Sequence, residues 1–264
     1  MKLLITSIIL AGSLLADSFT TRYDVNVGMF GKVGYADVSL EENQDTYEMK
    51  LVATLVGTAA SLTGKRVETY ISKGHILDGK YTPDSFIKIK KTTREERIQT
   101  YNFNHESKEV KLHEEKNKWV SEMKFDTIAF KLVKTDVQQK SDKTLSLEVF
   151  RDQDVLSSYL NTVKSCNSQN REYNLLAVGA HNDDRDVTLS FLEGLQREEV
   201  ASSFSKDTGH IYNLHVQPID QEEKTVDVLI AFDNDGHMKE AVLGNVFWIG
   251  EVNAKRVYHQ VSSN

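Results

Sequence analysis

FTTRYDVNV, residues 19–27, is the stretch that decides the fold, because apolar and polar side chains alternate along it. The alternation resumes at Val33–Leu40 after a turn at residues 28–31, and again at Thr46–Val56 after a turn at residues 43–45. A period of two places every second side chain on the same face of a strand. Such runs, spaced about ten residues apart, predict an antiparallel meander.

The same pattern continues along most of the chain. Pro83 and Pro218 are the only prolines, so long uninterrupted strands are allowed. Further strands are predicted at residues 67–73, 84–92, 97–104, 109–114, 126–135, 172–180, 185–193, 209–217 and 225–233, with two more between residues 238 and 261. The Lys- and Glu-rich residues 114–124 and the polar residues 135–143 are predicted to be exposed connections, and residues 58–66 a helical turn or a loop.

One segment, residues 152–166, changes to a helical period. Its apolar residues follow the spacing i, i+1, i+4, i+5, i+8, which is one face of a helix: Val155, Leu156, Tyr159, Leu160 and Val163. Asp152 or Asp154 would be the N-cap. The predicted fold is mainly β, an antiparallel curved sheet or open half-barrel with one central amphipathic helix. We expect a single β-rich domain over residues 17–264, with strand blocks at 17–150 and 171–262 flanking the helix.

The N-terminus has the pattern of a secretory signal peptide. Lys2 precedes the apolar run Leu3–Leu10, and small residues follow before Ala16. A buried N-terminal strand or helix is the alternative. We expect cleavage near Ala16 and a periplasmic protein without a lipid anchor, since no Cys follows the apolar run. No second run approaches the roughly 20 apolar residues of a transmembrane helix.

Composition limits the classes of partner. The chain has 32 Lys and Arg against 39 Asp and Glu, a net charge of −7, which argues against nucleic-acid binding. Cys166 is the only cysteine and cannot form an internal disulfide. Its position near the predicted helix end favours a packing role over a reactive one.

Three stretches resemble one family of bacterial exported proteins, the domain-of-unknown-function 3108 family. They are the opening around residues 23–36, with Gly28 and Gly31, the helix start at residues 154–160, and residues 228–236. The chain departs from the family at Ala231-Phe232, where a tryptophan-containing strand is commoner, and at residues 165–225. The resemblance implies an envelope location and a fold like the open half-barrels of lipoprotein carriers, with a helix across the concave side. It implies no activity.

Local clusters give little sign of catalysis or metal binding. Asp233–His237 resembles the start of a calcium loop, but position 12 would be Gly244 instead of a bidentate Glu, so a hairpin turn is favoured. His181–Asp184 is interpreted as a hairpin loop. The remaining histidines lack metal-ligand spacing: His75, His105, His113, His210, His215 and His259. No nucleophile elbow, phosphate loop or dinucleotide fingerprint is present. We therefore expect no catalytic residue, cofactor or metal.

A basic stretch has two interpretations. It contains Lys88, Lys90, Lys91, Arg94 and Arg97, interrupted by two glutamates. A solvated strand face is the simpler interpretation, and a contact with an anionic head group is the other.

These observations leave three functions open. A carrier or binding module would hold an apolar or amphipathic envelope ligand, such as a lipid, against Leu156, Tyr159 and Leu160. An interaction protein would bind another envelope protein through a sheet edge or the charged connections. A hydrolase of an envelope polymer is the third hypothesis, which only scattered acidic residues favour.

Overall fold

The computed structural model describes residues 18–165, 172–179, 187–205, 208–216, 226–233, 237–246 and 250–261. The predicted signal peptide, Cys166 and the loop at residues 181–184 lie outside them. The described strands are β1 (Phe19–Val27), β2 (Gly31–Asn43), β3 (Thr46–Leu55), β4 (Val67–Leu77), β5 (Lys80–Lys91), β6 (Glu95–Asn104), β7 (Glu109–Asp126), β8 (Lys131–Ser146), β9 (Glu172–Leu175), β10 (Val187–Phe191), β11 (His210–Val216), β12 (Val226–Phe232), β13 (Met238–Val246) and β14 (Gly250–Val261).

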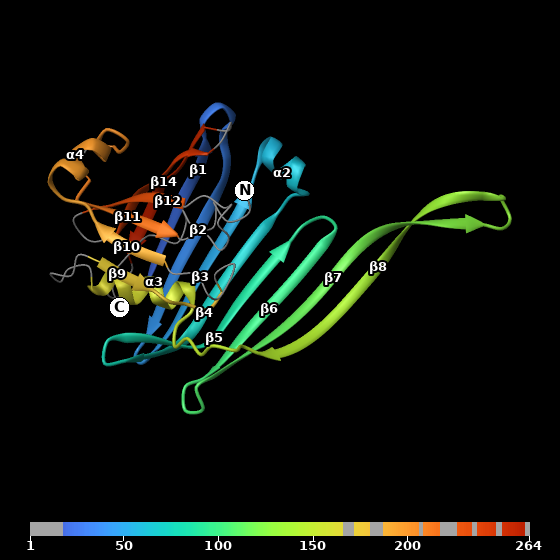
Figure 1. The fold of residues 1–264 in the computed structure, drawn as a ribbon, viewed down its shortest axis with the longest axis horizontal. Coiled ribbons are helices and arrows are strands. Elements are labelled where there is room, and N and C mark those ends of the chain that lie inside the picture. The colour runs from blue at the N-terminus through green and yellow to red at the C-terminus, as the bar shows by residue number, and fades with distance from the viewer. Residues whose placement is uncertain are drawn as a thin grey trace.

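All the described strands join one sheet, in the order β8-β7-β6-β5-β4-β3-β2-β1-β14-β13-β12-β11-β10-β9 (Figure 1). The pairs are antiparallel, including β1 with β14, which joins the two ends of the chain in the middle of the sheet. The sheet is not closed, since β8 and β9 are its edges in the described part of the chain. The predicted class, a mainly β antiparallel sheet left open, is confirmed.

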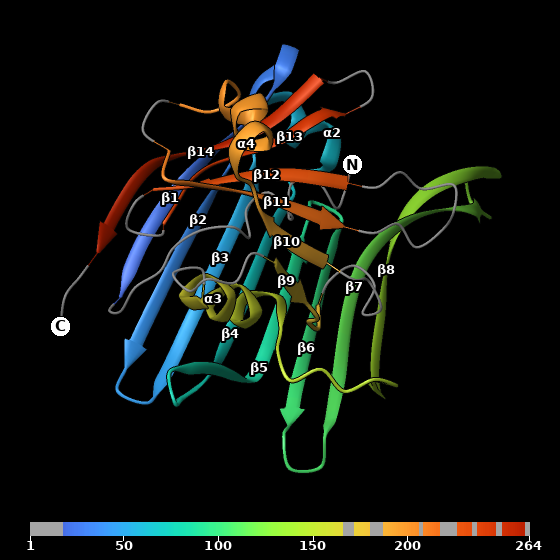
Figure 2. The ribbon, with the colours of Figure 1, turned by 60° about the vertical axis from the view of Figure 1, so that its left-hand side comes forward.

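The core lies on one face of this sheet because the strands alternate. In β1, Phe19, Thr21, Tyr23 and Val25 are buried, and the residues that alternate with them are not. The sheet curls (Figure 2), and the segment after β9 reaches the inner face of β5, where Gly179 contacts Lys88 and Phe86. Gly179 marks this approach: its φ is +89°, and a Cβ would lie 2.2 Å from the ring of Phe86. Only glycine fits there without strain.

Helix α3 (Val155–Ser165) lies on the inner face, against β4, β5 and β9. Its N-cap is Asp154, whose Oδ1 accepts the backbone N–H groups of Leu156 (2.7 Å) and Ser157 (3.1 Å). The predicted helix at residues 152–166 is confirmed with slightly narrower bounds, and Asp152 is not its cap.

The short helices partly depart from expectation. The 3-10 helix η1 (Gly28–Phe30) occupies the first predicted turn, and α2 (Gly57–Thr63) is the expected helical turn. A further helix, α4 (Gly194–Ala201), was not predicted; it follows β10, which ends at Phe191. No helix in the described ranges is long and apolar enough to cross a membrane.

Two predicted connections are wrong. Residues 114–124 belong to β7 and residues 135–143 to β8, and the two strands pair continuously from Lys111↔Ser146 to Asp126↔Lys131. The strand predicted at 126–135 begins only at Lys131, because residues 127–130 form the turn. The reason is that neither face of this part of the hairpin is buried, so charged side chains are tolerated at every position and the alternation disappears.

Candidate functional site

The inner face of β4 and β5 is apolar where α3 covers it. Leu156 and Leu160 are fully buried, and Tyr159 nearly so. On the sheet side, Tyr81 and Phe86 are also fully buried. The three residues predicted to contact a ligand therefore pack between the helix and the sheet, and a ligand would reach them only if α3 moved.

Polar contacts fix the helix on this apolar surface. The Asn161 side chain accepts the backbone N–H of Tyr81 and donates to its carbonyl, both at 2.8 Å. Ser72 donates to Asp154 Oδ2 at 2.6 Å, and Ser72 and Tyr47 share a hydrogen bond of 2.9 Å. These hydrogen bonds fix the position of α3 along β4 and β5.

Asp154 is a buried carboxyl group in that contact. Burial raises the pKa of Asp154 to about 6, although hydrogen bonds from Ser72, Ser157 and the helix N-terminus oppose the shift. Burial also raises the pKa of Tyr47. The contact between α3 and the sheet therefore includes a carboxyl group, that of Asp154, whose charge is costly to bury.

Beyond α3, the same inner face carries charges. The cross-strand register places Glu68 of β4 opposite Lys90 of β5, and Lys90 opposite Arg97 of β6. Arg66 donates through Nε to Glu68 Oε1 at 2.7 Å, and Tyr70 donates to Oε2 at 2.9 Å. Glu68 is buried, and both partners of its ion pair with Arg66 are mostly covered.

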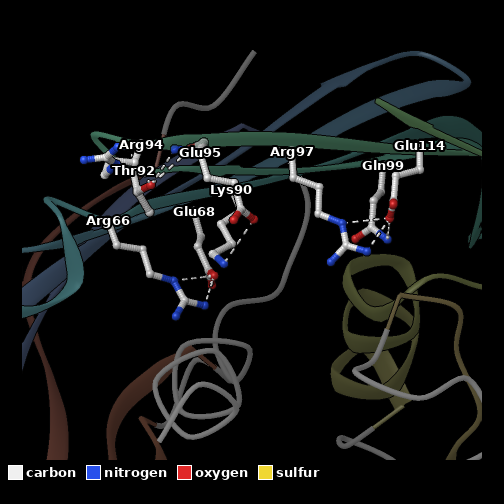
Figure 3. Close-up of polar contacts among 9 residues, drawn as sticks. All are labelled: Arg66, Glu68, Lys90, Thr92, Arg94, Glu95, Arg97, Gln99 and Glu114. Atoms are coloured by element: carbon white, nitrogen blue, oxygen red, sulfur yellow. Dashed lines mark hydrogen bonds and ion pairs between the residues drawn. The ribbon is translucent and has the colours of Figure 1, made fainter. Parts of the chain in front are cut away.

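A second carboxylate lies on β7. Glu114 Oε2 accepts from Arg97 Nε at 2.7 Å and from Gln99 Nε2 at 2.9 Å, and the Glu114 side chain is 14% exposed. Lys90 lies 3.6 Å from Glu95. We name this set the ionic band: Arg66, Glu68, Lys88, Lys90, Glu95, Arg97, Gln99 and Glu114. Figure 3 shows the band residues that it labels extending from the strands toward the side on which α3 lies.

Lys88 is the band residue that adjoins the apolar surface covered by α3. Its ammonium group lies over the ring of Tyr70, 5.8 Å from the centroid, and donates to the carbonyl of Gly179 at 3.3 Å. Each carboxylate of the band has a cationic partner, and four cationic side chains face three acids. A charged side chain is partly covered at low cost only when it is paired in this way.

The residues of the predicted basic stretch do not all lie in the ionic band. Lys88, Lys90 and Arg97 belong to the ionic band, whereas Lys91 is exposed and paired with Glu96. Arg94 instead contacts the β7–β8 hairpin. Sequence reasoning missed Arg66, Glu68 and Glu114. Arg66 precedes both β4 and the strand predicted at residues 67–73, so no strand period linked it to Glu68.

The other candidate clusters do not form a metal site in the described part of the chain. Asp233 accepts the backbone N–H of His237 at 2.8 Å and an Arg256 hydrogen bond at 2.7 Å, and β12 and β13 pair across this turn as the hairpin interpretation predicts. His75 and His215 each pair with one aspartate. Within the residues described, no three His, Cys, Asp or Glu side chains gather as a metal site would require.

Comparisons with known proteins extend the fold assignment only. No family model and no curated protein matches the chain, so membership of the domain-of-unknown-function 3108 family is not supported. Among solved structures, the fold is similar to a crystal structure described as a β-barrel-like protein of domain of unknown function DUF1849 from Brucella abortus. The TM-score is 0.52 at 12% identity, over 95% of this chain and 100% of that one. The chain therefore has a β-barrel-like fold shared with a domain of unknown function.

Proposed function

We propose that this is an exported envelope protein that binds and carries an amphipathic ligand on the inner face of its sheet. The observation that carries the proposal is the change of character along that face. The surface under α3 is apolar, and the adjoining ionic band is charged and partly buried. An amphipathic molecule has the same two parts.

In this proposal the two parts of the ligand contact different residues. The polar head lies at the ionic band, where Arg97 and Arg66 can exchange a protein carboxylate for an anionic head group. The apolar part takes the surface now covered by Leu156, Tyr159 and Leu160 once α3 has moved. Periplasmic export, for which the apolar run Leu3–Leu10 is the support, would bring the protein to such ligands.

Titration with a fluorescent fatty acid tests this proposal. The double variant Arg97→Gln/Glu114→Gln removes both charges of one pair, so that no buried charge is left alone. We expect its affinity to fall about tenfold to a hundredfold, since a charge-assisted hydrogen bond contributes about 1.5–3 kcal/mol.

The matched control is Arg22→Gln/Asp37→Gln. This pair also links two neighbouring strands, at 2.6 Å, but it is exposed and on the opposite face of the sheet. It should bind like the wild type. Equal binding by both double variants, with both folded, would reject the ionic band as the head-group site.

A further inference from the structure

An apolar tip ends the longest hairpin of the molecule. The β7–β8 turn and the strand residues beside it expose five large apolar side chains: Met123, Phe125, Ile128, Phe130 and Leu132. Ile128 is 97% exposed and Phe130 83%. Phe125 and Phe130 contact each other edge to face, with centroids 5.3 Å apart, so the apolar surface continues across the turn.

This tip is held away from the rest of the protein. The register of β6 with β7 ends at Glu95↔Lys118, and the next residue, Trp119, donates its backbone N–H to the Arg94 carbonyl at 2.8 Å. Within residues 119–138, named the arm here, the strand pairs are those between β7 and β8. Figure 1 shows the arm continuing beyond the ends of the other strands. Its base is fixed by Arg94, which donates to Ser121 at 3.1 Å and to Asp136 at 2.7 Å. These contacts tie the base of the arm to the turn between β5 and β6.

The arm as a whole has three lysines and three acids, but the charges are separated, since Glu122 and Asp136 lie toward its base. Between residues 123 and 134 there are three lysines, Lys124, Lys131 and Lys134, and one acid, Asp126. That carboxylate accepts the N–H groups of Ile128 (2.8 Å) and Ala129 (3.0 Å) within the turn. The whole chain, by contrast, has a net charge of −7. The tip is a basic and apolar end on an acidic protein.

The turn keeps an aromatic residue in a costly conformation. Phe130 has a φ of +49°, in the left-handed region where glycine or asparagine is the usual residue. A bulky side chain there costs free energy and gains no buried contact in compensation, since Phe130 is mostly exposed. Residues in strained backbone positions are concentrated at functional sites.

We propose that the arm tip docks on a lipid bilayer containing anionic phospholipids. Exposed Ile and Phe side chains enter the boundary between head groups and acyl chains, and the neighbouring lysines contact the lipid phosphates. From Met123 to Asp126 the strand advances roughly 10 Å, which matches the usual depth of interfacial insertion. This inference does not depend on the inner-face ligand.

Two other occupants fit the tip less well. The interior of a protein interface is depleted of lysine, whereas three lysines adjoin these apolar side chains. A second copy of the chain would bring two basic tips together, and like charges at an interface are repulsive.

Flotation with vesicles tests the proposal. Protein purified from its envelope is mixed with vesicles of phosphatidylcholine alone or with part of it replaced by phosphatidylglycerol. We expect flotation with the anionic vesicles, and roughly tenfold or more weakening in Ile128→Ser/Phe130→Ser. Replacing Lys124, Lys131 and Lys134 by Gln should weaken binding to the anionic vesicles by about fivefold for each lysine.

The matched control is Leu62→Ser, in α2, since Leu62 is also 83% exposed but lies far from the arm in sequence and pairing. It should float like the wild type, and all variants should keep the wild-type melting temperature. Wild-type protein that fails to float, or a tip variant that floats equally well, would overturn the proposal. So would a tip-dependent dimer that forms in sedimentation without vesicles, or tip-dependent capture of a protein in the absence of lipid.

Discussion

The strands under α3 and the strands of the arm have the same secondary structure and opposite environments. In β5, Tyr81 and Phe86 are completely buried by the helix and the curled sheet. In the arm, Phe125 and Phe130 lie in solvent. Backbone pairing extends along both regions, with one register shift, between Lys73 and Gly74 of β4. The difference shows that hydrogen-bonded pairing alone can extend a hairpin, whereas burial of one face is what makes a strand contribute to the core.

Leucine truncation should give the largest contrast between the two regions. Leu160→Ala, on the buried face of α3, is expected to lower the free energy of unfolding by about 2–5 kcal/mol, because it leaves a cavity between the helix and the sheet. Leu132→Ala, in the arm, should change it by at most about 0.5 kcal/mol. Urea denaturation of both variants measures this. Equal losses would show that the arm is packed, or that α3 is not.

The two regions should also respond to pH in opposite directions. Folding raises the pKa of Asp154 from 3.8 to about 6, so the stability from its protonated form is complete below about pH 4 and lost as the pH rises through 6. Asp154→Asn keeps an N-cap and removes that loss. Its stability relative to the wild type should therefore rise by about 3 kcal/mol across this window.

Asp126 is the matched acid in the arm. Hydrogen bonds from the backbone of Ala129 and Ile128 lower its pKa, so its contribution is present at neutral pH and lost as the pH falls through the lowered value. For Asp126→Asn the difference from the wild type should shrink on acidification. A pH-independent difference for Asp154→Asn, measured by thermal melts between pH 3 and 7, would contradict the buried charge.

Two backbone positions give the smallest contrast. Gly179→Ala places a Cβ against Phe86 at a positive φ and should cost about 1–3 kcal/mol. Phe130→Gly, in the arm, removes a left-handed aromatic residue and should be neutral or stabilising by roughly 1 kcal/mol. Calorimetry of both variants checks the signs. A destabilised Phe130→Gly protein would mean that Phe130 packs in the folded state.

Local sequence was sufficient to predict an element where one of its faces is buried. The predicted strand at residues 19–27 has the bounds of β1, and the predicted helix is α3 to within a few residues. The charged residues 114–124 and 135–143 could not be recognised as strands. The exposed two-stranded arm has no buried face to impose alternation, and nearer its base the covered side chain of Glu114 is charged instead of apolar.

The candidate site was predictable only in part. The helix face with Leu156 and Leu160 followed from spacing, and the structure buries it. The ionic band depends on which strand residues lie opposite one another, as Glu68 does with Lys90. That register is set by the bulges and turns of the whole sheet, so no short stretch of sequence contains it.

Native mass spectrometry of the protein purified from its own envelope shows whether a ligand occupies the inner face. We predict a retained species of lipid-like mass on the wild type and on Arg22→Gln/Asp37→Gln, and its loss from Arg97→Gln/Glu114→Gln. A wild-type mass equal to that of the polypeptide alone would contradict the account. A species retained equally by all three proteins would place it elsewhere than at the ionic band.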